Sequence, residues 1–418
     1  MILCTTCEGL HSWRKNAPTD KAPGLNAGAG FGAILHKYPR LDNMIGAEAQ
    51  RGKRLGQLRI YRFFWVAVSI LAWAGTGPAA LSSPLHRIVA VGDLHGDFAA
   101  WRDITRAAKL VNDGGNWIGA DAVLVQTGDA VDRGPDSLKI IHDIMRLQLE
   151  ARRVHGQVIA LVGNHEAMNV IGDLRYLSAQ DYAAYTDGNS VQRREKVYEA
   201  NKAVIQASYR QHDPKMTDDA VKQAWFAATP LGTVEHQIAW DPQGKIGRWI
   251  AGNPAVILLD GTLFVHAGIS PAYASMPIAE INRQLDAALQ AKSTDPGSII
   301  NDPLGPLWYR GLATPIMDAA GGPTGKTPEA AASIAPAEPP IETQLDNLLS
   351  VYGAKRIVIG HTPILAGIAM LYGGRLIRID TGITSVYGGA VSYLDILDGT
   401  PIAHAISRSQ SSTKEGAQ

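Results

Sequence analysis

From residue 87 onwards, short apolar runs alternate along the chain with longer stretches in which apolar residues recur at helical spacing. The short runs predict buried strands at 87–91, 122–126, 157–162, 255–259, 262–265 and 356–359. The longer stretches predict helices at 98–110, 137–154, 278–291 and 341–352. Because strands that alternate with helices usually pair in parallel, the pattern predicts an α/β fold, classed as α+β in some schemes.

Three segments depart from this alternation. Residues 170–250 are polar and helix-prone, which predicts a helical insertion that lies over the functional site of the domain. Residues 316–340 are rich in alanine, proline and glycine and predict a flexible surface insertion. From 375 to about 405, alternating runs separated by glycine turns predict antiparallel strands that close a second sheet. We therefore expect one domain at 85–408, followed by a disordered tail at 409–418.

The N-terminal region carries a basic stretch, an apolar core and a small-residue exit in succession. The basic residues recur between 51 and 62, the apolar core is 63–74, and glycine, proline and alanine dominate 75–80. This order is typical of a secretory signal peptide, and the break at Gly75, Gly77 and Pro78 favours cleavage near Ala79 or Ala80. The uncharged run 63–85 also suits an uncleaved membrane anchor.

Signal peptides begin close to the start of a protein, so we expect Met44 to be the true start. Residues 44–80 would then be the signal peptide, and 1–43 would be untranslated or disordered. Cys4 and Cys7 would be absent from the mature chain, which suits an oxidising compartment, and one CxxC pair is weak evidence for zinc. We expect export to the periplasm or, with an uncleaved segment, anchoring in the inner membrane with the folded domain outside the cytoplasm.

Composition excludes one class of partner. Apolar residues make up 46% and charged residues 19% of the chain, which is ordinary for a soluble globular enzyme. Lysine plus arginine equals aspartate plus glutamate at 39 each, so no net field attracts nucleic acid and we expect no nucleic-acid binding. Membrane contact is expected only through the N-terminal apolar segment.

Polar side chains follow five of the predicted strands, at the point where each strand ends. They are Asp93 and His95, then Asp129, Asp132 and Arg133, then Asn164 and His165, and finally His266 and His361. Taken alone, the cluster at 129–133 also suits an ordinary polar turn, His361 a surface histidine and His266 a core histidine. Because ligands of α/β folds bind at the carboxyl ends of strands, the shared placement indicates one site.

The residue types in these clusters indicate metal ions and phosphate. Mixed carboxylate and imidazole donors suit first-row divalent metals such as manganese, iron or zinc, and not calcium. The absence of cysteine ligands argues against a closed structural zinc site. Two metals that share a bridging carboxylate are the usual apparatus for displacement at a phosphate ester, and an arginine fork suits the phosphate itself.

The motifs that contain these residues resemble a known family. GDLHGD at 92–97, GDAVDRG at 128–134 and GNHE at 163–166 precede HAG at 266–268 and GHTP at 360–363. In this order they resemble the calcineurin-like metallophosphoesterase superfamily, in the form found in phosphoprotein phosphatases. Trp-Tyr-Arg-Gly at 308–311, with GHTP, is similar to the bacterial Shewanella-like branch. The resemblance implies a β-sandwich flanked by helices, with a di-metal site at the carboxyl ends of the strands.

The resemblance also implies a role for each residue. Asp93 and His95 would hold one metal, Asp129 would bridge, and Asn164, His266 and His361 would complete the second site. His165 would be the general acid, oriented by Asp132. Arg133 and Arg310 would clamp the phosphate, with Asn164 as a further donor. Glu166 is expected to support its loop, Asp97 to cap a helix or stand behind the ligands, and the other histidines to be structural.

These roles predict a phosphomonoesterase in which a metal-bound water attacks phosphorus directly, with a phosphoprotein substrate of the serine/threonine type. An exported enzyme also meets small phosphoesters, so a nucleotide or dinucleoside polyphosphate hydrolase is the alternative. A catalytically silent protein that binds phosphorylated ligands is a remote third. One departure from the eukaryotic pattern concerns the segment around Asp380: an asparagine–tyrosine loop is replaced there, which predicts that a tyrosine over the site is missing.

Overall fold

The computed structural model describes residues 87–313 and 339–407 of the 418-residue chain. The predicted leader at 1–43, the predicted signal peptide at 44–80 and the predicted tail at 409–418 lie outside these residues. So does the predicted insertion at 316–340, apart from its last two positions. Within the described ranges, no helix combines the length and the apolar character needed to cross a membrane.

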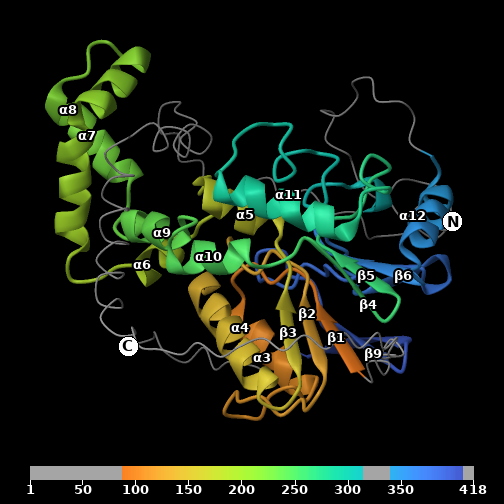
Figure 1. The fold of residues 1–418 in the computed structure, drawn as a ribbon. Helices are drawn as coiled ribbons and strands as arrows, with labels where there is room; N and C mark the ends of the chain where they lie inside the picture. Colours follow the sequence, from red (N-terminus) through yellow and green to blue (C-terminus); the bar gives the residue numbers. More distant parts are fainter. Residues whose placement is uncertain (1–86, 314–338, 408–418) are drawn as a thin grey trace, which may run out of the picture.

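The first of two five-stranded sheets contains the three strands predicted nearest the N-terminus (Figure 1). Its order is β10-β9-β1-β2-β3, with β1 (Arg87–Val91), β2 (Val123–Gln126), β3 (Gln157–Ala160), β9 (Val391–Leu397) and β10 (Thr400–Ile406). The strands β1, β2 and β3 are parallel, with Ile88 opposite Val123 and Val123 opposite Gln157. β9 runs antiparallel to β1, and β10 antiparallel to β9.

The second sheet has the order β4-β5-β6-β8-β7. Its strands are β4 (Val256–Leu259), β5 (Thr262–Val265), β6 (Arg356–Ile359), β7 (Ala369–Leu371) and β8 (Leu376–Arg378). The three central strands β5, β6 and β8 are parallel, and the edge strands are antiparallel to their neighbours. There are two short 3₁₀ turns in this region. In the sequence, η1 (Gly311–Ala313) lies between β5 and β6, and η2 (Tyr372–Gly374) lies between β7 and β8.

Side chains of successive strand residues enter two different cores. Ile88 and Ala90 of β1 belong to an inner cluster that also contains Phe264 of β5 and Val358 of β6. Val89 and Val91 belong instead to the outer core, together with helix residues. Because side chains alternate between the faces of a strand, this division means that the two sheets pack face to face and that their outer faces are covered too. Burial of both faces explains why the strands read as unbroken apolar runs.

Helices cover the outer faces of the sandwich. α3 (Phe98–Ala107) and α4 (Ser137–Arg152) pack on the first sheet, and α11 (Ile278–Gln290) and α12 (Ile341–Tyr352) contribute Leu285 and Leu345 to the same outer core beside the second. The fold is therefore a mixed α/β sandwich flanked by helices, which confirms the predicted fold class.

Residues 170–250 contain helices and no strand. After α5 (Asn164–Ile171) come α6 (Ala179–Ala184), α7 (Ser190–His212), α8 (Asp218–Ala228), α9 (Thr233–Trp240) and α10 (Lys245–Ala251). α7 and α8 pair through a small core of their own around Tyr198 and Trp225. Figure 1 shows this pair projecting away from the two sheets, whereas α6, α9 and α10 lie against the body.

The C-terminal strands differ from the prediction of an antiparallel second sheet in two respects, the first being that β8 pairs in parallel with β6. The last two, β9 and β10, extend the first sheet next to β1, and only β7 and β8 join the second. β9 is held there by the side chains of Leu394 and Ile396, which enter the inner cluster, and by an ion pair of 2.7 Å between Arg87 and Asp395. An alternating pattern identifies a strand but not the sheet edge to which it pairs.

Candidate active site

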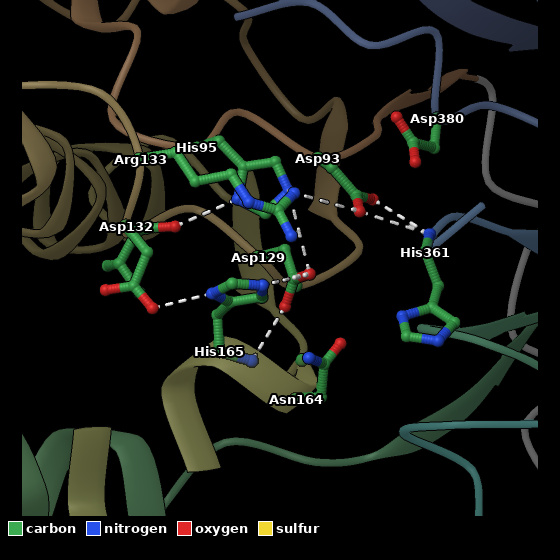
Figure 2. A network of polar contacts seen from close by, with 12 residues as sticks. Asp93, His95, Asp129, Asp132, Arg133, Asn164, His165, His361 and Asp380 are labelled. Atoms are coloured by element: carbon green, nitrogen blue, oxygen red, sulfur yellow. Dashed lines mark hydrogen bonds and ion pairs between the residues drawn. The ribbon is translucent and has the colours of Figure 1, made fainter. Parts of the chain in front are cut away.

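The five polar clusters of the sequence meet at one place, where parallel strands of both sheets end. Figure 2 labels residues of four of them, and His266, the fifth, lies 3.0 Å from Asn164. The residues that follow β1, β2 and β3 come from the first sheet, and those that follow β5 and β6 come from the second. The convergence is visible in direct contacts: the backbone N–H of His361 donates to both carboxylate oxygens of Asp93, each at 3.1 Å. The site is therefore built across the sandwich.

The loops that carry the site have unusual backbone conformations. Five of its non-glycine residues have positive φ angles between 44° and 71°, namely His95, Asp129, Asp132, Arg133 and His361. Such angles are uncommon for residues with a side chain, and strained backbone of this kind concentrates at functional sites. The strain turns the side chains of consecutive loops toward a common centre.

Two glycines allow the carboxylates to lie close to neighbouring strand ends. A Cβ atom on Gly163 would come within 2.3 Å of an oxygen of Asp129, and one on Gly360 would come within 2.3 Å of an oxygen of Asp93. No side-chain atom fits at that distance, so these positions require glycine because of the close approach.

A first group of ligand-type atoms surrounds the Nε2 atom of His266. Asn164 Oδ1 lies at 3.0 Å, His361 Nδ1 at 3.1 Å and Asp129 Oδ2 at 3.4 Å from it. The Nδ1 atom of His266 is 2.9 Å from the carbonyl oxygen of Thr127, a contact that favours a proton on Nδ1 and leaves the lone pair of Nε2 facing the group. Four electron-pair donors that face one another form a natural position for a cation.

A second group shares Asp129 with the first. The Nε2 atom of His95 is 3.9 Å from Asp129 Oδ2 and 4.0 Å from Asp93 Oδ2. The Nδ1 atom of His95 is 3.1 Å from the carbonyl oxygen of Val131, which again directs Nε2 inward. Two triads, His95–Asp129–His165 and Asp129–His266–His361, each have ligand atoms that all lie within 4.8 Å of one another. Asp129 belongs to both.

The buried carboxylates repel one another. Burial, together with repulsion from Asp380 and Asp129, raises the pKa of Asp93 well above its ordinary value. Burial likewise raises the pKa of Asp380 to about 6. Burial would also raise the pKa of Asp129, but the imidazoles of His266, His165 and His95 outweigh it and hold that pKa well below its usual range. A bound cation would relieve the repulsion, so the donor set fits divalent metal.

His165 and Asp132 form a buried pair beside these groups. The Nδ1 atom of His165 lies 2.6 Å from Asp132 Oδ2, and its Nε2 atom faces Asp129 Oδ2 at 3.9 Å. Burial lowers the pKa of His165, but the attraction of Asp129 and the bond to Asp132 exceed that effect, so the net pKa is raised. A protonated imidazole aimed at the metal-type ligands can donate a proton to a group bound there.

Comparison with known proteins agrees with this geometry. Residues 86–365 match the calcineurin-like phosphoesterase family. The chain belongs to this family. An uncharacterized protein of Schizosaccharomyces pombe is 30% identical over 318 residues, which cover 74% of this chain and 76% of that protein. The Shewanella-like protein phosphatase 2 of Arabidopsis thaliana is 27% identical, over 71% of each chain.

Solved structures and a further relative extend the comparison. The cold-active protein-tyrosine phosphatase of a psychrophilic Shewanella species has the same fold, with a TM-score of 0.53 at 22% identity over 76% of this chain and 77% of that one. The symmetrical bis(5'-nucleosyl)-tetraphosphatase of a Janthinobacterium species is 25% identical over 48% of this chain and half of that protein. The predicted resemblance is thus confirmed, and this calcineurin-like phosphoesterase is a hydrolase of phosphoric ester bonds.

Sequence reasoning missed two tyrosines of this phosphoesterase. The guanidinium carbon of Arg133 lies 5.0 Å from the ring centre of Tyr387 and 5.2 Å from that of Tyr176, and the guanidinium donates to the hydroxyl of Tyr387. The expectation that the segment after Asp380 brings no tyrosine to the site is therefore wrong: Tyr387 reaches it from seven residues further on. The ring of Tyr176 also lies 4.9 Å from the ring of His165.

Arg133 and Arg310 approach the phosphoesterase site from different elements. Arg133 donates to the Nε2 atom of His95 at 2.8 Å, so its guanidinium reaches the metal-type ligands. Arg310 donates to the hydroxyl of Thr362 at 2.6 Å. Burial lowers the pKa of Arg310, while Asp93, Asp129 and Asp380 attract its charge and oppose that effect. Both arginines thus lie within the field of the buried carboxylates.

Two acidic residues in the motifs have supporting contacts. Glu166 accepts hydrogen bonds from the backbone N–H groups of Asp129 and Gly163, each at 2.8 Å, and of Ala130 at 2.9 Å. Asp97 caps α3 by accepting from the N–H of Ala100 at 2.9 Å. Both contacts agree with the supporting roles predicted for these residues.

Proposed function

We propose that this protein is a metal-dependent phosphomonoesterase of the serine/threonine phosphoprotein phosphatase type. The observation that carries the proposal is the buried His165–Asp132 pair beside Asp129, whose Oδ2 atom lies 3.9 Å from Nε2 of His95 and 3.4 Å from Nε2 of His266. A phosphate held by those ligands would lie next to a proton donor. Phosphatase-named relatives support a phosphorylated substrate.

The ligand sets fit two divalent ions of manganese, iron or zinc. Asp93 and His95 would hold one, Asp129 would be shared, and Asn164, His266 and His361 would hold the other. The low pKa of His361, caused by burial and by the neighbouring His266 and Arg310, keeps that imidazole neutral and able to ligate. When bound, such ions supply charge stabilisation on phosphoryl oxygens and a more acidic water as nucleophile.

The side chains perform the remaining steps. Arg133 would bind two phosphate oxygens through its fork, with Arg310 and the amide of Asn164 as further donors. Asp132 would hold the imidazole of His165 in the tautomer that carries hydrogen on Nδ1, and the proton on Nε2 of His165 would pass to the leaving alkoxide. The direct transfer to water requires no covalent phosphoenzyme.

A substrate panel tests this function. Full-length protein supplied with Mn²⁺ should release phosphate from phosphoserine and phosphothreonine peptides, and excess chelator should abolish the release. Turnover mainly of phosphotyrosine peptide would contradict the serine/threonine substrate class. Turnover mainly of dinucleoside polyphosphate would favour the alternative, a nucleotide or dinucleoside polyphosphate hydrolase. Binding of phosphopeptide without any hydrolysis would favour the silent binding protein and contradict the proposal.

We also propose that the segment 44–80 directs export to the periplasm. The basic residues before the apolar core at 63–74 and the small residues after it support a cleaved signal. N-terminal sequencing of protein from the producing cells should begin near residue 80 or 81. A chain that retains the segment and is extracted only with detergent would indicate the anchored alternative, and a retained segment in the cytosolic fraction would contradict export.

A further inference from the structure

Asn169 makes two buried hydrogen bonds next to the proposed acid. It lies four residues after His165 on α5, so one turn of helix places the two side chains on the same face of the helix. Its amide nitrogen donates to Asp132 Oδ1 at 2.9 Å and to the carbonyl oxygen of His165 at 2.9 Å. The residue is only 3% exposed, so water does not replace either bond at low cost.

The bond to Asp132 completes the contacts of that carboxylate. Oδ2 faces the Nδ1 atom of His165 at 2.6 Å, and Oδ1 accepts from Asn169. The backbone N–H of Asp132 donates to the hydroxyl of Ser137 at 2.9 Å. A carboxylate held at both oxygens cannot rotate about its terminal bond without losing one of the two partners. Asn169 therefore fixes the direction from which Asp132 meets the imidazole.

A second buried asparagine separates this role from ordinary helix packing. Asn201 on α7 is 4% exposed and donates to the carbonyl oxygen of Val197, four residues earlier, at 2.8 Å. That bond is the same local contact that Asn169 makes to His165. Only Asn169 adds a carboxylate partner from another loop, and that carboxylate is the one that orients the proposed acid.

We propose that Asn169 is a positioning residue for proton donation to the leaving group. By holding Asp132 it keeps the imidazole of His165 with Nδ1 toward the carboxylate and Nε2 toward the ligand cluster. The inference rests on the proposed function, in which His165 is the proton donor. Displacement of a catalytic group by about 1 Å costs up to about 100-fold in rate, so removal of the amide should weaken proton donation selectively.

Leaving-group basicity makes this role measurable. The strongly basic alkoxide of phosphoserine needs a proton to depart, whereas 4-nitrophenolate leaves readily without one. A variant with a misdirected acid should therefore lose much more kcat on a phosphoserine peptide than on 4-nitrophenyl phosphate. A variant that is merely less well folded should lose the same factor on both.

The test uses full-length protein with Mn²⁺ and the variants Asn169→Ala, Asn169→Ser and Asn201→Ala. Asn169→Ala should lower kcat on the peptide by about 10- to 100-fold, with less than about a threefold fall on 4-nitrophenyl phosphate and an unchanged KM. Serine can keep the bond to the i−4 carbonyl but is too short to hold Asp132 as well, so Asn169→Ser should behave like Asn169→Ala. Asn201→Ala should keep wild-type kinetics.

Other results would overturn the inference. If the Asn169 variants lose the same factor of kcat on both substrates, or lose none, a role in proton donation is refuted. If Asn169→Ala does not fold, Asn169→Ser is used for this comparison. The His165→Asn variant provides the benchmark for leaving-group dependence. A wild-type protein that turns over neither substrate, or a fully active His165→Asn, would refute the proposed function and the inference with it. If the wild-type protein is active and the Asn169 variants show no difference between the two substrates, the inference about Asn169 is refuted while the proposed function stands.

Discussion

Asp129→Asn is expected to lower kcat/KM for phosphomonoesters by at least about 10³-fold. Metal ions typically supply several kcal/mol of transition-state stabilisation, and each 1.4 kcal/mol or so corresponds to a factor of ten in rate. Asp129 belongs to both candidate ligand triads, so loss of its charge weakens both sites together. The fold should persist, because an asparagine oxygen can still accept the bond that the N–H of His165 now donates to Asp129 at 3.0 Å.

A binding measurement separates this effect from unfolding. Added Mn²⁺ should raise the melting temperature of the wild-type protein, because a ligand that binds only the native state stabilises it by mass action. Asp129→Asn should lose that rise but should still unfold cooperatively in chelator, at a somewhat lower temperature because the charge attracted by the neighbouring imidazoles is gone. Asp395→Asn is the matched control: it removes a buried charge paired with Arg87 and should lower stability without loss of the Mn²⁺ response. An Asp129→Asn protein that keeps both activity and response contradicts the shared-ligand assignment.

His165→Asn is expected to lower kcat on phosphoserine peptides by about 10²–10⁴-fold, the usual contribution of a general acid. The imidazole is 2% exposed and fixed at Nδ1 by Asp132, and its Nε2 atom faces the ligand cluster. Asparagine fills part of the space but donates no acidic proton. The Mn²⁺-dependent rise in melting temperature should survive, because His165 is not among the proposed metal ligands, which are all unchanged in this variant.

The contrast between the two variants identifies their roles. Asp129→Asn should lose activity together with the metal response, whereas His165→Asn should lose activity alone. His404→Asn is the control. His404 on β10 stacks on Tyr393 of β9, and its replacement should leave activity unchanged. Near-wild-type turnover of the peptide by His165→Asn would show that another group protonates the alkoxide.

Much of the fold followed from local pattern. The strands β1, β5 and β6 begin and end where the apolar runs predicted them, because burial on both faces leaves no polar position to blur their limits. The edge to which β9 pairs was not predictable, since the pairing with β1 depends on contacts such as Arg87 with Asp395 that join residues 308 positions apart. Local periodicity contains no information on such pairs.

The site shows the same division. Asp93, Asp129 and His165 were recognisable because each follows a strand in a motif whose residue types suit metal or proton transfer. Tyr387 and Tyr176 were not, because each is a single tyrosine in a loop with no neighbouring chemistry. Asn169 had a usable signal, its i+4 spacing from His165, but only the fold shows that Asp132 completes the arrangement. Asp380 was noted in sequence, yet its burial beside Asp93 appears only in three dimensions.

The hydrogen bonds from the backbone of His361 to Asp93 join residues 268 positions apart. Contacts of such high sequence separation form late, because the loop entropy must be overcome before they add stability. We therefore expect the nascent chain to lack phosphatase activity until the strand that precedes residue 361 has been synthesised and docked. Recovery of phosphatase activity during refolding would accordingly report the joining of the two sheets and not the formation of either one.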